Sequence, residues 1–232
     1  MARTGRGVLG AVAAGVGVLL LTRRLTQTWG TRDDEHAARL PGDDLVPHAR
    51  VVATRGVTID APPGDVWPWL VQLGQGRGGF YSYDLLENLA GLGIRSAGTI
   101  GERWQSLAVG DDVRLAAQAA LRVALLEPED HLVLLGVPGP AEPDVMPFAF
   151  SWAFVLRALP PGDGGGARTR LLVRERYRPT SRPGRAVVEA VQPVSFLMTQ
   201  KMLRGVRDRA ERVSRGTPRR RPARGTTGRR RP

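Results

Sequence analysis

The stretch from Thr58 to Trp67 reads TIDAPPGDVW and marks a change from strand to helix. Residues 49–59, which overlap the start of this stretch, read ARVVATRGVTI. Apolar side chains recur there at alternate positions, which predicts a strand with one buried face carrying Val51, Ala53, Val57 and Ile59. Pro62 and Pro63 then end the strand, because proline cannot continue a sheet ladder but suits the first turn of a helix.

Two short helices are expected after these prolines. Residues 65–73 (DVWPWLVQL) place apolar side chains on one helical stripe, although Pro68 should kink this helix or shift its start. Gly74 is placed to act as its left-handed cap. A second short helix is predicted over residues 84–89, ending before Gly91.

The middle of the chain is typical of antiparallel strands joined by turns. Glu127-Pro128-Glu129-Asp130 is the clearest hairpin turn. The strand candidates are 100–107, 109–115, 121–126, 131–137, 148–159 and 169–178. After Pro193, an apolar stripe at helical spacing predicts a long amphipathic helix from Val194 to Val213. This order predicts an α+β fold with about seven strands and one long C-terminal helix.

The element order, together with Thr58-Ile59-Asp60-Ala61-Pro62-Pro63 and Val66-Trp67, resembles the START-like or SRPBCC superfamily, also called helix-grip or polyketide cyclase/dehydrase-like. The stretch Trp69–Leu89 (WLVQLGQGRGGFYSYDLLENL) is similar to a membrane-anchored bacterial branch of that superfamily. The likeness covers roughly residues 51–213.

The resemblance implies a curved antiparallel sheet wrapped around the C-terminal helix, with a cavity between them. Members bind lipids, sterols, polyketides or other apolar molecules, and some are cyclases or aromatases. Because this fold serves several activities, the fold alone does not name a function.

The net charge of +12 comes from the two ends of the chain. Residues 1–24 carry four arginines and no acid, and residues 215–232 carry eight arginines and no acid. The body between them has equal numbers of basic and acidic residues. A domain built to bind a nucleic-acid backbone needs a basic face in its folded part, so the charge balance argues against nucleic acid as a partner of this body.

The N-terminal residues 1–24 contain an uncharged apolar run, Gly7–Thr22, with two arginines on each side. Sixteen residues of helix span roughly 24 Å, slightly less than a bilayer core of about 30 Å. We expect a single-pass membrane anchor, with a cleaved signal peptide and a buried helix as alternatives. The basic flanks balance, so they do not decide the orientation, and we favour a cytoplasmic domain.

The remaining domain boundaries follow from composition. Residues 25–48 are predicted to be a linker with a short helix, and residues 49–214 the START-like domain. The Arg-rich tail, residues 215–232, lacks apolar side chains and is expected to be disordered. It could be solvated, contact anionic lipid, or contact nucleic acid.

Six residues are candidates for the lining of the ligand pocket. Apolar pockets are usually lined by aromatic side chains with a few polar groups, which favours Phe80, Tyr81, Tyr83, Trp104 and Trp152, although each could simply pack in the core. Glu175 shares a strand face with Leu171, Val173 and Tyr177. If that face points inward, the Glu175 carboxylate enters the cavity and needs a partner there. The alternative is a solvated or arginine-paired Glu175 near the end of the sheet.

Other sequence features give weaker functional signals. The glycine-rich run 74–79 follows a predicted helix instead of opening one, so a helix cap is favoured over a phosphate loop. Asp84 and Glu87 could share a helical face but are more simply a cap and a solvated side chain. The chain has no cysteine, and its three histidines are widely separated, so neither a metal nor another cofactor is expected.

These observations favour a membrane-tethered protein that binds a small apolar or amphipathic ligand without turning it over. The alternative is a cyclase or aromatase-type enzyme that uses the same cavity, with Glu175 or a pocket tyrosine as its acid–base group.

Overall fold

The computed structural model describes residues 22–83, 95–116, 119–138, 147–162 and 165–216. The strands are β1 (Val51–Ile59), β2 (Asp112–Ala116), β3 (Ala119–Glu127), β4 (His131–Gly136), β5 (Phe148–Leu159) and β6 (Arg168–Pro179). The helices are α2 (Asp33–Ala37), α3 (Pro63–Val71), α5 (Arg182–Gly216) and a short 3-10 turn, η1 (Glu102–Trp104).

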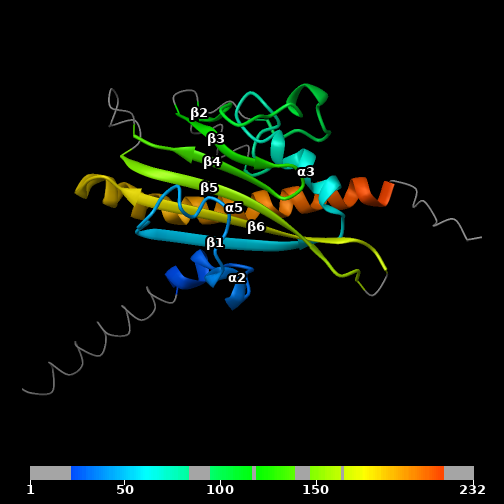
Figure 1. Cartoon of the computed structure of the whole chain (residues 1–232), viewed down its shortest axis with the longest axis horizontal. Helices are drawn as coiled ribbons and strands as arrows, with labels where there is room; N and C mark the ends of the chain where they lie inside the picture. Colours follow the sequence, from blue (N-terminus) through cyan, green and yellow to red (C-terminus); the bar gives the residue numbers. More distant parts are fainter. Residues whose placement is uncertain (1–21, 84–94, 117–118, 139–146, 163–164, 217–232) are drawn as a thin grey trace, which may run out of the picture.

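The six strands form one antiparallel sheet in the order β1-β6-β5-β4-β3-β2. The sheet curves along α5, which packs against β1, β5 and β6 (Figure 1). Helix α3 packs against the C-terminal half of α5. The predicted α+β, helix-grip fold is therefore confirmed.

The sheet has six strands in the described part of the chain instead of about seven, because residues 100–107 do not form the predicted strand. They contain η1 instead. The Gly101 amide donates to the Gln72 side chain, and the Trp104 carbonyl accepts from Arg77. These backbone groups bond to the end of α3 and the loop after it, so they do not pair with a neighbouring strand.

Helix α3 begins two residues earlier than the sequence predicts. Pro62 is its N-cap and Pro63 its first residue, the position where a missing amide proton costs least. Pro68 lies inside the helix, which ends at Val71. Gly74 has a positive φ of 125°, but it belongs to the following loop and is not the cap.

Helix α5 is longer than the predicted Val194–Val213, because it begins at Arg182 and contains Pro193. The proline can remove only the one hydrogen bond to the Glu189 carbonyl, and Val188 is buried in the turn before it. Packing of that earlier part against the sheet therefore offsets the loss. Gly205 is required where α5 meets the loop after α3, since a Cβ there would lie 2.5 Å from the Tyr81 carbonyl oxygen.

Residues 25–48, predicted as a linker with a short helix, cover the outer face of β1 and β6. Leu40 and Val46 are buried, and Glu35 of α2 pairs with Arg170 of β6 at 2.6 Å. Burial acts to raise the pKa of Glu35, but the hydrogen bonds from Arg170 and from the Arg32 amide, with the Arg170 charge, outweigh it and lower that pKa.

Arg174 holds this covering segment in place. Its guanidinium donates to the carbonyls of Glu35, His36 and Ala38, to Asp43 at 2.7 Å, and to the hydroxyl of Thr54. Both sides of β6 are therefore buried, one against this segment and one against α5.

We expect Arg174→Met to lower the free energy of unfolding by about 2–3 kcal/mol, because it leaves several buried acceptors without donors. Amide hydrogen exchange should speed up first over residues 33–44. The matched control is Arg176→Met, since Arg176 reaches Asp43 at only 3.4 Å and is more exposed. Equal losses in the two variants would contradict this role for Arg174.

Candidate functional site

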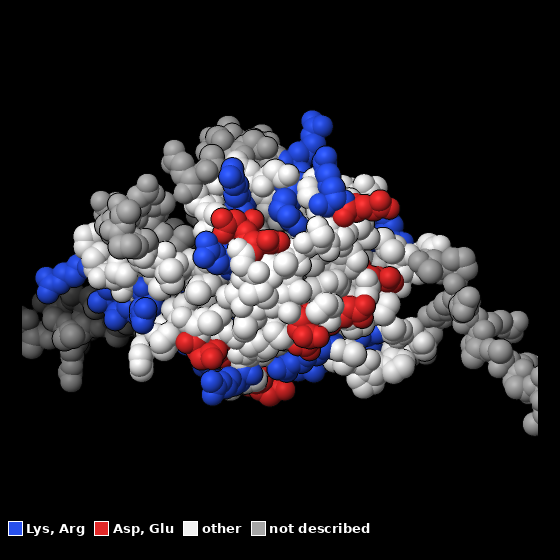
Figure 2. Space-filling model, turned by 45° about the horizontal axis from the view of Figure 1, so that its top comes forward, with Lys and Arg blue, Asp and Glu red and all other residues white. Residues whose placement is uncertain are grey.

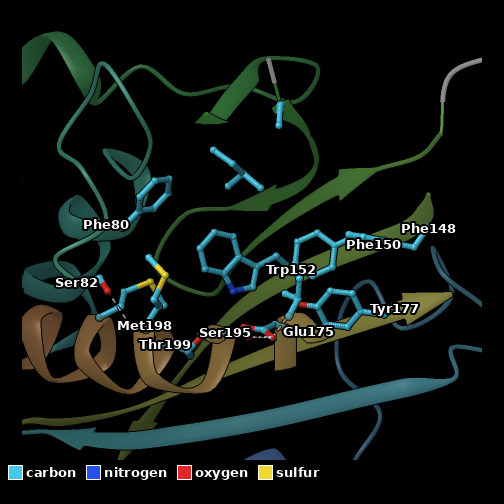
Figure 3. Close-up of a pocket in the computed structure, with 14 residues that line it drawn as sticks. Phe80, Ser82, Phe148, Phe150, Trp152, Glu175, Tyr177, Ser195, Met198 and Thr199 are labelled. Carbon is cyan, nitrogen blue, oxygen red and sulfur yellow. Dashed lines mark hydrogen bonds between the residues drawn. The ribbon is translucent and has the colours of Figure 1, made fainter. Parts of the chain in front are cut away.

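A cavity of about 330 Å³ lies between the inner face of the sheet and α5. Figure 3 shows it bounded by side chains from β5 and β6, from the loop after α3, and from α5. Its volume is within the range of small-molecule sites. Its wall reaches the surface at Val191 of α5, which is exposed.

Aromatic side chains form most of one wall. Alternate residues of β5 point to the same side of a strand, so the run F-A-F-S-W places three rings in a row: Phe148, Phe150 and Trp152. Phe150 and Tyr177 of β6 lie 4.6 Å apart between ring centroids, and Phe80 lies 6.2 Å from Trp152. Met198 and Met202 of α5 contribute to the opposite side. The cavity therefore presents a mainly apolar, aromatic surface.

Glu175 of β6 lies at the polar end of this cavity. One carboxylate oxygen accepts from Arg55 at 3.0 Å and from Thr199 at 2.8 Å. The other accepts from Ser195 at 2.5 Å and from Tyr177 at 3.1 Å. The carboxylate is buried, and these four donors satisfy it. Burial and the negative charge of Glu175 raise the pKa of the Tyr177 hydroxyl well above its usual value.

Arg55 of β1 supplies the positive charge that balances Glu175. Its side chain is 1% exposed. Its Nε donates to the Thr26 carbonyl, and its guanidinium stacks over Phe196 of α5 at 5.7 Å. The ion pair therefore ties β1, β6 and α5 together behind the cavity.

The Trp152 ring nitrogen is a buried donor that makes no hydrogen bond with any described residue. In the view of Figure 3 it is turned toward the side of the cavity where Glu175, Ser195 and Thr199 lie. A buried donor without an acceptor is costly. Because Trp152 lines the cavity, an acceptor on a bound molecule could satisfy it.

The structure brings three of the six sequence-predicted site residues to the cavity: Phe80, Trp152 and Glu175. Tyr81 is instead buried in the core, where its hydroxyl bonds to Gln72 and to the Trp69 carbonyl. Tyr83 is partly exposed and faces Lys201. Trp104 lies in η1, beneath the guanidinium of Arg103, and does not line the cavity.

Several site residues were not predicted from sequence: Phe148, Phe150, Tyr177, Ser195, Thr199 and Arg55. Two patterns contain the missing information. The alternation F-x-F-x-W in β5 aligns the three rings, and Ser195 and Thr199 are four residues apart on one face of α5. Arg55 occupies the one charged position on the otherwise apolar inner face of β1.

The glycine-rich loop 74–79 is closed on itself. Gly74 and Gly79 exchange two backbone hydrogen bonds, and the Gly78 amide donates to the Gln72 carbonyl. These amides are therefore not available to hold a phosphate. The predicted helix carrying Asp84 and Glu87 lies outside the described residues.

Charged side chains of both signs alternate around an uncharged centre on the face drawn in Figure 2. That face has no continuous basic surface of the kind a nucleic-acid backbone needs. Among the described residues no cluster of acidic or histidine side chains could hold a metal ion. No helix in the described ranges is long and apolar enough to cross a membrane, and the Gly7–Thr22 run lies almost entirely outside them.

The curved sheet, the gripped helix and the aromatic cavity together define a helix-grip protein with an internal apolar site. No protein-family model and no curated protein matches the chain. Among solved structures, a hypothetical protein from Helicobacter pylori matches with 13% identity and a TM-score of 0.46, over 78% of this chain and 99% of that one.

Two further structures are similar. Norcoclaurine synthase from Thalictrum flavum, in a truncated form, matches with 14% identity and a TM-score of 0.39, over 70% of this chain and 92% of that one. A protein from Mesorhizobium loti matches with 15% identity and a TM-score of 0.37, over 70% of this chain and 98% of that one. All three structures have TM-scores below 0.5, so these likenesses carry no argument about a family, a ligand or an activity. The membrane-anchored branch stays a prediction.

Proposed function

We propose that this protein binds one small, mainly apolar ligand in the cavity between the sheet and α5, and that it does so without catalysis. The ligand carries a hydrogen-bond acceptor, such as a carbonyl oxygen, which meets the Trp152 ring nitrogen. The observation that carries this proposal is the unpartnered Trp152 donor in an otherwise aromatic cavity. The apolar run at Gly7–Thr22 supports a membrane tether for the same domain.

The state of Glu175 favours binding over catalysis. A general base needs a free lone pair within reach of the substrate proton. Both oxygens of Glu175 already accept from two donors each, and the Tyr177 hydroxyl donates to one of them. A cyclase or aromatase would have to break this cluster before Glu175 or Tyr177 could act as the acid–base group.

The expected ligand preference can be measured with two matched probes, 2-acetylnaphthalene and 2-ethylnaphthalene. The wild-type protein should bind the ketone about five- to tenfold more tightly, since one hydrogen bond contributes about 1 kcal/mol. Trp152→Phe should remove this preference, because the ring stays and the donor is lost. Isothermal titration of the detergent-solubilised full-length chain gives both affinities.

Trp104→Phe is the control, because that side chain lies outside the cavity. It should keep the preference for the ketone. Failure of the wild-type protein to bind either probe would overturn the proposal. Native mass spectrometry of the same sample distinguishes binding from turnover, since a bound probe should be recovered with unchanged mass.

A further inference from the structure

The N-terminal half of α5 is coloured gold in Figure 1. It carries an exposed apolar stripe. The stripe consists of Val187, Val191, Val194 and Leu197, which are 41%, 37%, 56% and 48% exposed. Spacings of four and three residues place them on one side of the helix. Single exposed apolar residues are common, but four on one helical stripe indicate a contact surface.

This stripe is free of charge but bordered by cations. Between Arg185 and Lys201, the only charged residue of α5 is Glu189, whose carboxylate pairs with Arg23 at 2.9 Å. Arg182 and Arg185 precede the stripe, and Lys201 follows it; all three are exposed. An apolar surface with a basic border matches the interface of an anionic bilayer.

The segment that follows the apolar N-terminal run lies beside this stripe. Thr22, Arg23 and Thr26 line a groove of about 550 Å³ together with residues of α5 that include Phe196 and Leu197. Leu25 in the same segment is 61% exposed. The uncharged run Gly7–Thr22 ends at the residue where this segment begins. The chain that we expect to enter the membrane therefore joins the domain at the α5 stripe.

We propose that the Val187–Leu197 face of α5, together with Leu25, docks on the surface of an anionic lipid bilayer. A second copy of the chain fits this face less well. A symmetric dimer places the same patch on both partners, so cations at the border of one patch would lie against cations at the border of the other. Anionic lipid headgroups would instead neutralise these cations.

Docking in this way has a consequence for the cavity. Val191 belongs to the exposed stripe and also lines the cavity. The cavity wall would therefore reach the lipid surface, and an apolar ligand could pass between bilayer and cavity without crossing water. This consequence rests on the proposed function, whereas the docking itself does not.

The absence of cysteine makes a site-specific test possible. The variants Val194→Cys and Val109→Cys each accept one environment-sensitive label in the full-length chain. Val109 is a matched control because it is 62% exposed but lies before β2, away from α5. Both labelled proteins are reconstituted in vesicles of phosphatidylcholine and phosphatidylglycerol that contain spin-labelled lipid.

We expect the label at position 194 to be quenched at least about threefold more than the label at position 109, because it lies in the lipid interface. Quenching at 194 should fall when phosphatidylglycerol is omitted or salt is raised. Equal quenching at the two positions would overturn the docking proposal. If quenching at 194 stays unchanged without phosphatidylglycerol, anionic lipid has no role in the docking. If the label at 194 becomes shielded without vesicles as the protein concentration rises, the face belongs to a contact with a second copy of the chain, and the docking proposal is overturned. The naphthalene titration is independent of all these outcomes.

Discussion

The Arg55→Met variant should lose about 3–5 kcal/mol of its free energy of unfolding, because it leaves a buried carboxylate without its counter-charge. Glu175 is 3% exposed, and Arg55 is the only cation that the structure shows bonded to it in the described residues. Ser195, Thr199 and Tyr177 still donate to it in the variant, but hydroxyl groups carry no compensating charge. Chemical denaturation followed by circular dichroism measures the loss.

A second variant separates the lost charge pair from the lost packing. Arg55→Met combined with Glu175→Leu replaces the whole pair by apolar side chains of similar size. We expect this double variant to recover most of the stability that the single variant loses, because no uncompensated charge remains. If the single variant is as stable as the wild type, or if the double variant is less stable than the single one, the ion pair is not what holds β1, β6 and α5 together.

The sequence predicted the architecture well because the signals for it are local. Three such signals are the alternation in 49–59, the two prolines after it and the apolar stripe of the last helix. Each is a pattern among residues that are close together in the sequence. These signals predicted the fold class. Of the six strands predicted after residues 49–59, five lie close to the observed β2 to β6, and only 100–107 is not a strand. The sequence does not predict the early start of α5, because Pro193 favours a helix boundary, whereas packing of the turns before it outweighs its cost.

The predicted site residues were less accurate because the direction of a side chain depends on the turn that carries it. Tyr81 is next to Phe80, which lines the cavity, but its backbone has a positive φ of 55°. In this left-handed conformation the ring turns into the core against Trp69 instead of following a strand alternation. No local pattern in Phe80–Tyr83 indicates that turn.

The partner of Glu175 was missed for a different reason. Arg55 lies 120 residues earlier in the chain, and the two meet only because β1 and β6 pair in a register that places Ala53 opposite Glu175. Sequence alternation shows that each charge is on an apolar face. The pairing of the two strands is needed to show that both charges are on the same one.

Alkaline pH should destabilise this protein, because two of its tyrosines, Tyr81 and Tyr177, are buried with neutral hydroxyl groups. Burial raises the pKa of Tyr81 to about 12, although a hydrogen bond from Gln72 and the charges of Arg209 and Arg77 act to lower it. Burial and the charge of Glu175 raise the pKa of Tyr177 in the same direction. In the unfolded chain both hydroxyls ionise near pH 10.

The sign of the effect follows from these pKa values. Tyr81 contributes stability that is fully present below about pH 10 and is lost as pH rises toward about 12, because the unfolded state releases its proton first. The raised pKa of Tyr177 acts in the same direction above about pH 10. Tyr81 alone should account for roughly 2–3 kcal/mol, and Tyr177 adds to it. Denaturant unfolding at several pH values from about 9 to about 12 gives the slope.

Tyr81→Phe is the informative control for this slope. The Gln72 amide that donates to Tyr81 also reaches the Thr99 carbonyl at 3.3 Å, so the variant should stay folded at neutral pH. Its stability should fall less steeply above pH 10 than that of the wild type, because one buried hydroxyl no longer has to stay protonated. Parallel pH profiles for the two proteins would show that the ionisation of Tyr81 does not control alkaline unfolding.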